Sequence, residues 1–216
     1  MKINKLKFVA FIVFIAFIML SGCARKEIRN INSSGKNIIC FGDSLTFGYG
    51  AKPGEDYPTA LGQLLDIPVI NAGVDGDTTI DALKRIKNDV LDKQPLLVIV
   101  EFGGNDFLSK VPKEETLKNI RAMIEQIQAQ GGMVALVDFG AGMLLKEYHA
   151  DFHKIATESQ SIFIPNILSG ILTSPSLKSD FIHPNGRGYK MIAGKIQATV
   201  TPYLKQNSAL QRVDQK

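Results

Sequence analysis

The stretch Asn37-Ile38-Ile39-Cys40-Phe41-Gly42-Asp43-Ser44 decides the fold class of this chain. It is an apolar run of strand length, without the polar alternation of a half-exposed strand, and it ends in a glycine, an aspartate and a serine. Continuous apolar strands are typical of a sheet that is covered on both faces. Four further short apolar runs follow at Val69–Ile70, Leu96–Glu101, Met133–Asp138 and Ile162–Ile164.

The segments around these runs place apolar residues at helical spacing. In the second of them, Ile80, Leu83 and Ile86 form one stripe, and Asp77-Thr78-Thr79 supplies the N-cap. Five β–α units in succession predict a three-layer α/β/α sandwich with a parallel sheet, whose ligands bind at the carboxyl ends of the strands. The expected helices are Thr59–Leu65, Thr79–Leu91, Glu114–Gln130, Leu144–Ser159 and Gly188–Leu204.

Ser44 follows the first predicted strand in a turn that would project its hydroxyl above the sheet. A serine hydroxyl is a weak nucleophile, so it needs a base, usually a histidine that is oriented by a carboxylate. His183 stands three positions after Asp180, in a loop just before the last helix, which lets one loop carry both groups. Taken by itself, this segment better fits an aspartate that caps a turn beside an exposed histidine.

Acyl transfer also needs hydrogen-bond donors for the tetrahedral oxyanion. Gly73, after the second strand, offers a backbone N–H, and Asn105, after the third, offers a side-chain amide. Together with the Ser44 N–H, these groups would converge from three adjacent strand ends. The alternative for Gly73 is a tight turn between strand and helix.

Four blocks resemble, in order and spacing, those of the SGNH (GDSL) hydrolase family. They are Gly42-Asp43-Ser44-Leu45, Gly73 after Asn71-Ala72, Gly103-Gly104-Asn105-Asp106 and Asp180-Phe181-Ile182-His183-Pro184. The surrounding residues look like the arylesterase, thioesterase I and lysophospholipase L1 branch. Because Thr46 stands where a classical nucleophile elbow has its second glycine, the α/β-hydrolase fold is less favoured.

The resemblance implies a flavodoxin-like fold with a five-stranded parallel sheet, and it implies residue roles. Ser44 is the nucleophile, His183 the base and Asp180 its orienting acid; Ser44, Gly73 and Asn105 form the oxyanion hole. We therefore expect a serine esterase that cleaves esters or thioesters through an acyl-enzyme, with no metal and no organic cofactor. The alternatives are an O-acetylesterase acting on cell-envelope glycans and a non-catalytic lipoprotein that binds a ligand.

Several apolar residues near the blocks either line an acyl groove or pack beneath it, and packing is the favoured interpretation for most of them. A metal site at His149 and His153, four apart on one predicted helix, lacks a third ligand at suitable spacing. Cys40 lies in an apolar run, where a thiol is expected to be buried and inert. The groove candidates are Phe47, Tyr49, Phe107, Leu108, Met143, Leu144 and Phe181.

The N-terminus has the layout of a secretory signal peptide. Lys2, Lys5 and Lys7 precede an apolar run of 13 residues, Phe8–Leu20, which is shorter than the roughly 20 residues of a membrane-spanning helix. Leu20-Ser21-Gly22-Cys23 then resembles the lipobox of bacterial lipoproteins. We expect Cys23 to be lipidated, which predicts an exported protein anchored at the outer side of a membrane; the alternative is an ordinary thiol.

These patterns divide the chain into a signal peptide (1–22), a polar tether (23–36), the hydrolase domain (37–205) and a polar tail (206–216). The 216 residues are 45% hydrophobic and 21% charged, which describes a folded chain, and two cysteines exclude a disulfide-stapled scaffold. Removal of the signal peptide lowers the formal charge from +4 to +1. We therefore expect no nucleic-acid partner, and no obligate protein partner.

Overall fold

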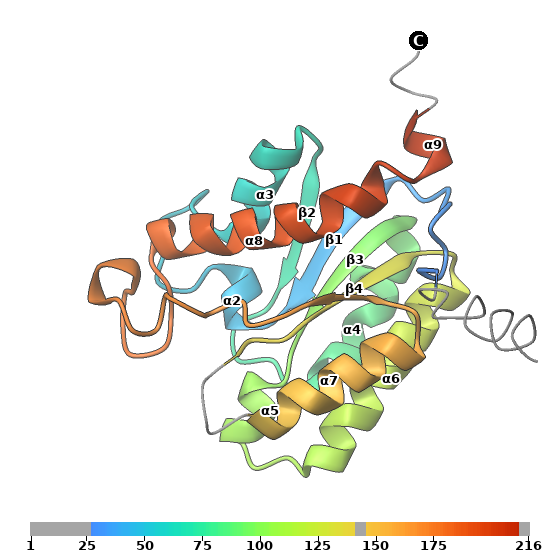
Figure 1. Cartoon of the computed structure of the whole chain (residues 1–216). Helices are drawn as coiled ribbons and strands as arrows, with labels where there is room; N and C mark the ends of the chain where they lie inside the picture. The colour runs from blue at the N-terminus through green and yellow to red at the C-terminus, as the bar shows by residue number, and fades with distance from the viewer. Residues whose placement is uncertain (1–26, 141–145, 212–216) are drawn as a thin grey trace, which may run out of the picture.

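The computed structural model describes residues 27–140 and 146–211. Five parallel strands form one sheet in the order β2-β1-β3-β4-β5. Figure 1 shows the twisted sheet, with β2, β1, β3 and β4 labelled. The predicted fold is therefore confirmed. The predicted signal peptide and Cys23 lie outside the described residues. The strands are β1 (Asn37–Gly42), β2 (Val69–Gly73), β3 (Pro95–Glu101), β4 (Met133–Val137) and β5 (Ile162–Ile164).

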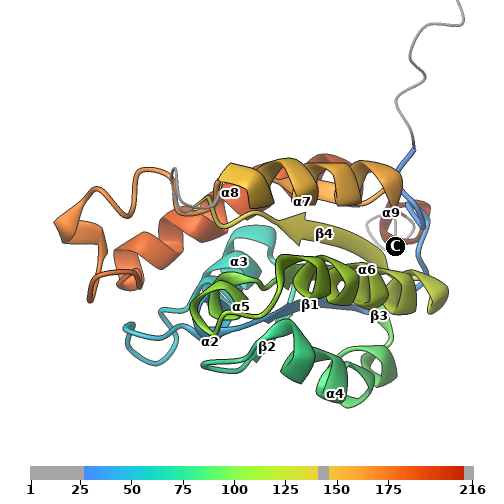
Figure 2. The same ribbon diagram turned by 90° about the horizontal axis from the view of Figure 1, so that it is seen from below.

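Helices cover both faces of the sheet. The helices α3 (Tyr57–Leu65) and α8 (Gly186–Leu204) pack together on one face, whereas α4 (Thr79–Asp89), α6 (Lys113–Ala129) and α7 (Lys146–Glu158) lie on the other (Figures 1 and 2). This is the layering that right-handed crossovers produce. Short helical turns complete the chain: α2 (Ser44–Phe47), α5 (Gly104–Leu108), α9 (Ser208–Gln211), η1 (Leu91–Lys93) and η3 (Pro175–Leu177).

The central strands are buried throughout, which explains their unbroken apolar runs. All residues of β3 and β4 are buried, as are five of the six in β1. On one side of the sheet the rings of Phe41 and Phe102 meet edge to face at 4.9 Å. On the other face the buried Tyr57 and Tyr189 belong to α3 and α8.

The register of the strands brings three carboxyl ends to one level. Gly42, the last residue of β1, pairs with Gly73 at the end of β2 and with Glu101 at the end of β3. Every loop that leaves these strands therefore begins at the same edge of the sheet. This edge is where the sequence predicts the functional site.

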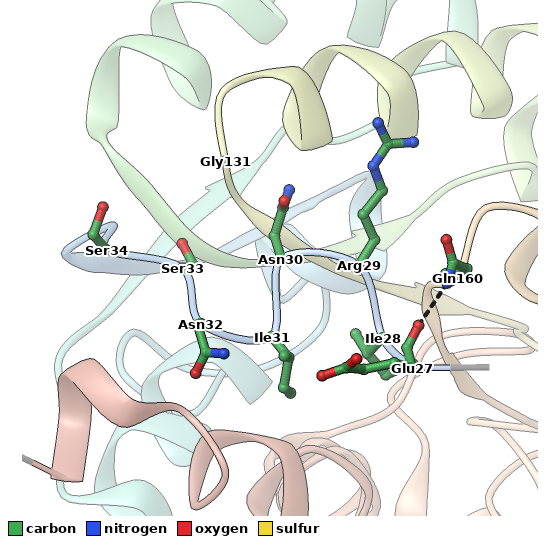
Figure 3. Close-up of a pocket in the computed structure, with 10 residues that line it drawn as sticks. All are labelled: Glu27, Ile28, Arg29, Asn30, Ile31, Asn32, Ser33, Ser34, Gly131 and Gln160. Carbon is green, nitrogen blue, oxygen red and sulfur yellow. Dashed lines mark hydrogen bonds between the residues drawn. The ribbon is translucent and has the colours of Figure 1, made fainter. Parts of the chain in front are cut away.

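The segment from Glu27 to Lys36, predicted to belong to a polar tether, is bound to the body of the protein instead. Asn30 donates through Nδ2 to the carbonyls of Gln128 (2.8 Å) and Gly132 (3.0 Å). Gln160 donates to the Glu27 carbonyl at 2.9 Å, the dashed line in Figure 3. A run of polar residues is thus ordered here because its hydrogen bonds reach distant loops.

The predicted polar tail is also folded in part. Asn207 is fully buried and donates to the carbonyls of Ile31 (3.0 Å) and Ser33 (2.9 Å), so it ties the end of the chain to the N-terminal segment. The helix α9 follows directly. Throughout the ranges that the structure describes, no helix has both the length and the apolar character needed to cross a bilayer.

Candidate active site

Ser44 stands at the turn between β1 and α2, at the carboxyl edge of the sheet. The preceding Asp43 caps α2, because its Oδ1 accepts the Leu45 N–H at 3.1 Å. The turn is so close to the strand that a Cβ at Gly42 would lie 1.9 Å from Thr46 Oγ1. A glycine before Asp43 is therefore required, and it lets the hydroxyl-bearing residue rise directly from the strand end.

The loop before α8 brings an imidazole to this hydroxyl. His183 Nε2 lies 3.1 Å from Ser44 Oγ, and His183 Nδ1 lies 2.7 Å from Asp180 Oδ2. A carboxylate only accepts hydrogen bonds, so it holds the proton on Nδ1 and leaves Nε2 free to accept. The structure thus brings together the three side chains that the sequence singled out.

The loop itself fixes the position of Asp180. Its other oxygen, Oδ1, accepts from the backbone N–H groups of Ile182 (2.9 Å) and His183 (2.8 Å). Burial opposes its charged form, but these donors and the imidazole outweigh burial and lower the pKa of Asp180. The ring of Tyr49 packs against the imidazole of His183, with 4.5 Å between the ring centroids, and this contact restrains rotation of the imidazole.

The predicted oxyanion donors are only partly placed as expected. Asn105 lies at the start of α5 and lines the same cavity as Ser44. The Gly73 N–H, in contrast, donates to Asn71 Oδ1 at 2.9 Å. A Cβ at Gly73 would lie 2.1 Å from the Phe47 N atom. Close packing of β2 against α2 therefore accounts for a glycine at this position.

The same loop presents a second glycine, Gly76, which the sequence motifs did not single out. Gly76 has φ +81°, and its turn is closed by the Asp77 N–H, which donates to the Val74 carbonyl. The Asp77 carbonyl accepts from Asn105 Nδ2 at 3.0 Å, so this turn lies beside the Asn105 amide. The signal that could have found it is the motif Gly76-Asp77-Thr78-Thr79 ahead of a helix.

Arg85 is another residue that sequence reasoning missed. From α4 its guanidinium donates to the carbonyls of Gly42 (3.0 Å) and Ala72 (2.8 Å), and it pairs with Asp77 at 2.6 Å. It also lies over the Phe41 ring at 4.5 Å. One side chain thus joins the ends of β1 and β2 to the loop that follows β2.

Asp106, in α5, supports the carboxyl edge of the sheet from the loop after β3. It is fully buried and accepts from the Thr79 backbone N–H at 2.9 Å, from the Thr79 hydroxyl, and from the Thr116 hydroxyl at 3.2 Å. These bonds tie the start of α4 to α5 and α6. They fix the loops on both sides of Asn105.

A cavity of about 380 Å³ opens beside Ser44 and His183. Of the groove candidates, Phe107, Leu108 and Phe181 line it, whereas Phe47 and Tyr49 do not; Met143 and Leu144 lie outside the described residues. Its walls are mainly apolar, and several of the apolar residues that line it were not among the groove candidates. These additional apolar residues are Leu45, Phe139, Leu168, Leu172 and Ile182.

A second cavity, of about 530 Å³, lies at the opposite end of the sheet. It is lined by residues 27–34, which include a turn, together with Gly131 and Gln160 from other parts of the chain (Figure 3). It contains none of the residues singled out for catalysis. Its hydrogen bonds serve to dock the N-terminal segment.

The remaining candidate groups are held by structural contacts. Burial raises the pKa of the Cys40 thiol, as expected for an inert core residue. His149 Nδ1 lies 2.6 Å from the buried Asp138, and the rings of His149 and His153 both pack against Phe163. Among the residues placed by the structure, no group of three or more His, Cys, Asp or Glu side chains is arranged to hold a metal.

Comparison with known proteins shows to which family this chain belongs. Residues 40–191 match the GDSL-like lipase/acylhydrolase family. The chain is 23% identical to the esterase TesA of Pseudomonas aeruginosa, covering 87% of this chain and 98% of that protein. It is 26% identical to the thioesterase 1/protease 1/lysophospholipase L1 of Escherichia coli, covering 82% and 88% respectively.

Two solved structures and one further relative complete the comparison. A TesA crystal structure superposes with a TM-score of 0.73 at 22% identity over 78% of this chain and 99% of that one. The SGNH-hydrolase family esterase AlinE4 does so with a TM-score of 0.61 at 33% identity over 80% and 96%. An uncharacterised lipoprotein of Bacillus subtilis, YqeF, is 28% identical over 56% of this chain and 52% of its own length.

Proposed function

This chain belongs to the GDSL-like lipase/acylhydrolase family and is a carboxylic ester hydrolase, and we propose that Ser44, His183 and Asp180 carry out its reaction. The observation that carries this proposal is the continuous chain of hydrogen bonds from Ser44 Oγ through the imidazole to Asp180. The same arrangement serves nucleophilic catalysis on unrelated folds.

In the proposed mechanism, Ser44 Oγ attacks the ester carbonyl while His183 Nε2 takes its proton. The imidazolium that forms is stabilised by Asp180 and then protonates the leaving alcohol or thiol, which yields the acyl-enzyme. His183 next takes a proton from water, whose oxygen attacks the acyl carbonyl and releases the acid. The Ser44 hydroxyl is restored when the imidazolium returns the proton.

The oxyanion of each tetrahedral intermediate needs preorganised donors. We assign this task to the Ser44 N–H, the Asn105 side-chain amide and the Gly76 N–H. Gly76 takes the place of Gly73, because the Gly73 N–H already donates to Asn71 whereas the Gly76 turn lies against Asn105. A substrate oxygen would replace Asp77 as the acceptor for the Asn105 amide.

The cavity supports a substrate with an apolar acyl chain. Its walls combine Leu45, Phe107, Leu168 and Leu172 with the reactive groups at one end, as in a site that binds an extended hydrocarbon. An acetylated glycan would leave these walls in contact with water. Medium-chain esters or thioesters are therefore favoured over acetyl sugars.

The test uses a fluorophosphonate probe together with a series of p-nitrophenyl esters of increasing acyl length, from acetyl to palmitoyl, run beside an acyl-CoA, a lysophospholipid and an acetylated sugar. We expect labelling at Ser44 and a maximum of kcat/KM at medium chain length. Preferential hydrolysis of the acetylated sugar would support the glycan esterase instead. An unlabelled Ser44 without turnover would leave only a ligand-binding protein.

We also infer that the protein is exported and anchored through a lipid on Cys23. The support is the lipobox-like tetrapeptide and the likeness of part of the chain to a protein named as a lipoprotein. Residues 27–34 lie at the end of the sheet opposite the loop that carries His183 (Figures 1 and 2). Since this segment is bound to the domain from Glu27 onward, an anchor at residue 23 would leave the catalytic edge facing away from the membrane.

Cys23→Ser tests this inference in the full-length chain. We expect the wild-type protein to incorporate a labelled fatty acid in bacterial cells and to enter the detergent phase, whereas the variant does neither. Esterase activity in detergent extracts should be equal for the two. Equal partition of both proteins into the aqueous phase would rule out the anchor without touching the catalytic assignment.

A further inference from the structure

Two carboxyl groups are buried directly beneath the nucleophile. Asp43 precedes Ser44 and is 3% exposed; Glu101 ends β3 beside Gly42 and is 1% exposed. Glu101 pairs with Gly42, the residue before Asp43, and each of the two carboxyl groups acts on the pKa of the other; both residues line the acyl cavity. The mechanism above gives neither of them a role.

The surrounding hydrogen bonds determine which carboxyl carries a proton. The Thr46 hydroxyl donates to Glu101 Oε2 at 3.0 Å, and Thr46 Oγ1 in turn accepts from the Tyr57 hydroxyl at 2.8 Å. Asp43 accepts from the Leu45 N–H. A proton on Glu101 therefore provides the donor that joins it to an ionised Asp43, whereas two ionised groups would repel each other in a buried position.

The charges agree with this assignment. Burial and the charge of Asp43 raise the pKa of Glu101 well above its ordinary value. Burial raises the pKa of Asp43 to about 6, although the Leu45 N–H and Glu101 both favour its charged form. Near neutral pH the pair thus holds one proton. The other titratable groups that face the pair are His183 and Asp106 toward Asp43, and Cys40, Tyr57 and Tyr189 toward Glu101.

We propose that Asp43 and Glu101 form a single-proton pair that positions Ser44, with Glu101 donating to an ionised Asp43 that holds the first turn of α2. The inference rests on the ester hydrolysis proposed above and adds two positioning residues to it. A second proton on the pair weakens the bond from the Leu45 N–H, since a neutral carboxyl accepts less strongly than a carboxylate. It also removes the negative charge that faces His183.

Substitutions at Glu101 test the pair through the pH dependence of kcat/KM for a p-nitrophenyl ester. Glu101→Gln retains a donor for Asp43 and an acceptor for Thr46, so kcat/KM should stay within about threefold of wild type. The acid limb of the pH profile, where kcat/KM falls at low pH, should not move. Glu101→Leu removes the donor, so Asp43 keeps its proton to higher pH. The acid limb should rise by about one pH unit, and kcat at pH 7 should fall about tenfold with little change in KM.

Tyr57→Phe is the matched control, because it removes a buried hydroxyl from the same network without removing the donor to Asp43. It should lower the melting temperature and leave the acid limb in place. If Glu101→Leu does not fold, Glu101→Met, which is closer in length, serves the same comparison. The proposal would be overturned if the acid limb of the pH profile did not move in the apolar variant. It would also be overturned if Glu101→Gln moved the acid limb as far as the apolar variant does.

Infrared spectroscopy tests the pair without relying on turnover. At pH 7 the wild-type protein should show the carbonyl stretch of a buried protonated carboxyl, and Glu101→Gln should lack it. Absence of this band in the wild type would reject the proton on Glu101. Labelling of wild-type Ser44 by the fluorophosphonate probe shows separately whether the ester hydrolysis itself holds.

Discussion

His183 Nε2 lies 3.1 Å from Ser44 Oγ, although 139 residues separate the two in the chain. The first residue belongs to the loop that leads into α8, and the second directly follows the central strand β1. Only the packing of α8 beside α3 brings that loop back to the edge where β1 ends. The reactivity of Ser44 therefore depends on a contact with a residue from the C-terminal part of the chain.

Asp180→Asn should reduce kcat/KM by at least about 100-fold, because the amide cannot stabilise the imidazolium as the carboxylate does. The side chain of Asp180 is 43% exposed, so the melting temperature should change little. Steady-state kinetics with a p-nitrophenyl ester and thermal unfolding measure the two effects. Activity within threefold of wild type would remove Asp180 from the mechanism.

Asn105→Ala should lower kcat by about 10²–10³-fold with a small change in KM, as expected when one donor to the oxyanion is lost. Asn71→Ala is the matched control, since Asn71 is also an amide at this edge but donates to Asp56 and accepts from Gly73. The control should lose much less activity. Equal losses in the two variants would indicate that both amides only hold their loops.

The two glycines at the end of β2 and in the loop after it should respond differently to substitution. Gly73→Ala places a Cβ 2.1 Å from the backbone of Phe47 and should lower stability by about 1–3 kcal/mol or more, as overpacking does. Gly76→Ala meets no atom within 4 Å, so only the left-handed backbone opposes it, at about 1–2 kcal/mol. Denaturant unfolding measures both; a larger stability loss at Gly76 would contradict the packing role of Gly73.

Leu172→Phe should shorten the acyl chains that the enzyme accepts, because the larger ring occupies part of the cavity. We expect kcat/KM for an octanoyl ester to fall about tenfold or more, with acetyl ester hydrolysis unchanged. Leu64→Phe, at an exposed position of α3 outside the cavity, is the control. A uniform loss across all chain lengths would mean that the acyl chain binds elsewhere.

Asn30→Ala should destabilise the domain by about 1–3 kcal/mol, because the carbonyls of Gln128 and Gly132 lose their donor. For a domain of this size that corresponds to a fall of several degrees in melting temperature. Ser34→Ala, at an exposed position of the same segment, should have no effect. If both variants have the same melting temperature as the wild type, residues 27–36 act as the loose tether that the sequence predicts.

The strands and long helices were predictable because each is set by a local pattern. The apolar run Ile38–Phe41 and the stripe of Ile80, Leu83 and Ile86 reflect burial on a strand and on one helix face. The structure extends β2 from the predicted Val69–Ile70 to Gly73, since Asn71 and Ala72 continue its pairing with β1. The sequence did not predict this extension, because Asn71, Ala72 and Gly73 do not continue the apolar pattern of the strand.

The site was predictable to the extent that its residues are rare and clustered in short motifs. Three histidines, one of them three positions after an aspartate, left few partners for Ser44. The roles of Arg85 and Glu101 were missed, because an arginine on a helix and a glutamate at a strand end have no distinctive spacing. Gly73 was named from the sequence and Gly76 was not considered, because the backbone angle, packing and hydrogen bonds that distinguish the two glycines appear only in the structure.

The order of residues along this chain determined its layers, the edge that carries the reactive groups and the identity of the three proposed catalytic side chains, because burial and hydrogen-bonding preferences act over a few neighbouring positions. The tertiary structure decided which loops meet beside Ser44, how closely Asp43 and Glu101 are buried together, and that residues 27–36 bind to the domain. Each of these depends on atoms that are distant in the chain, and their distances and shared burial arise only when the sheet and its helices pack.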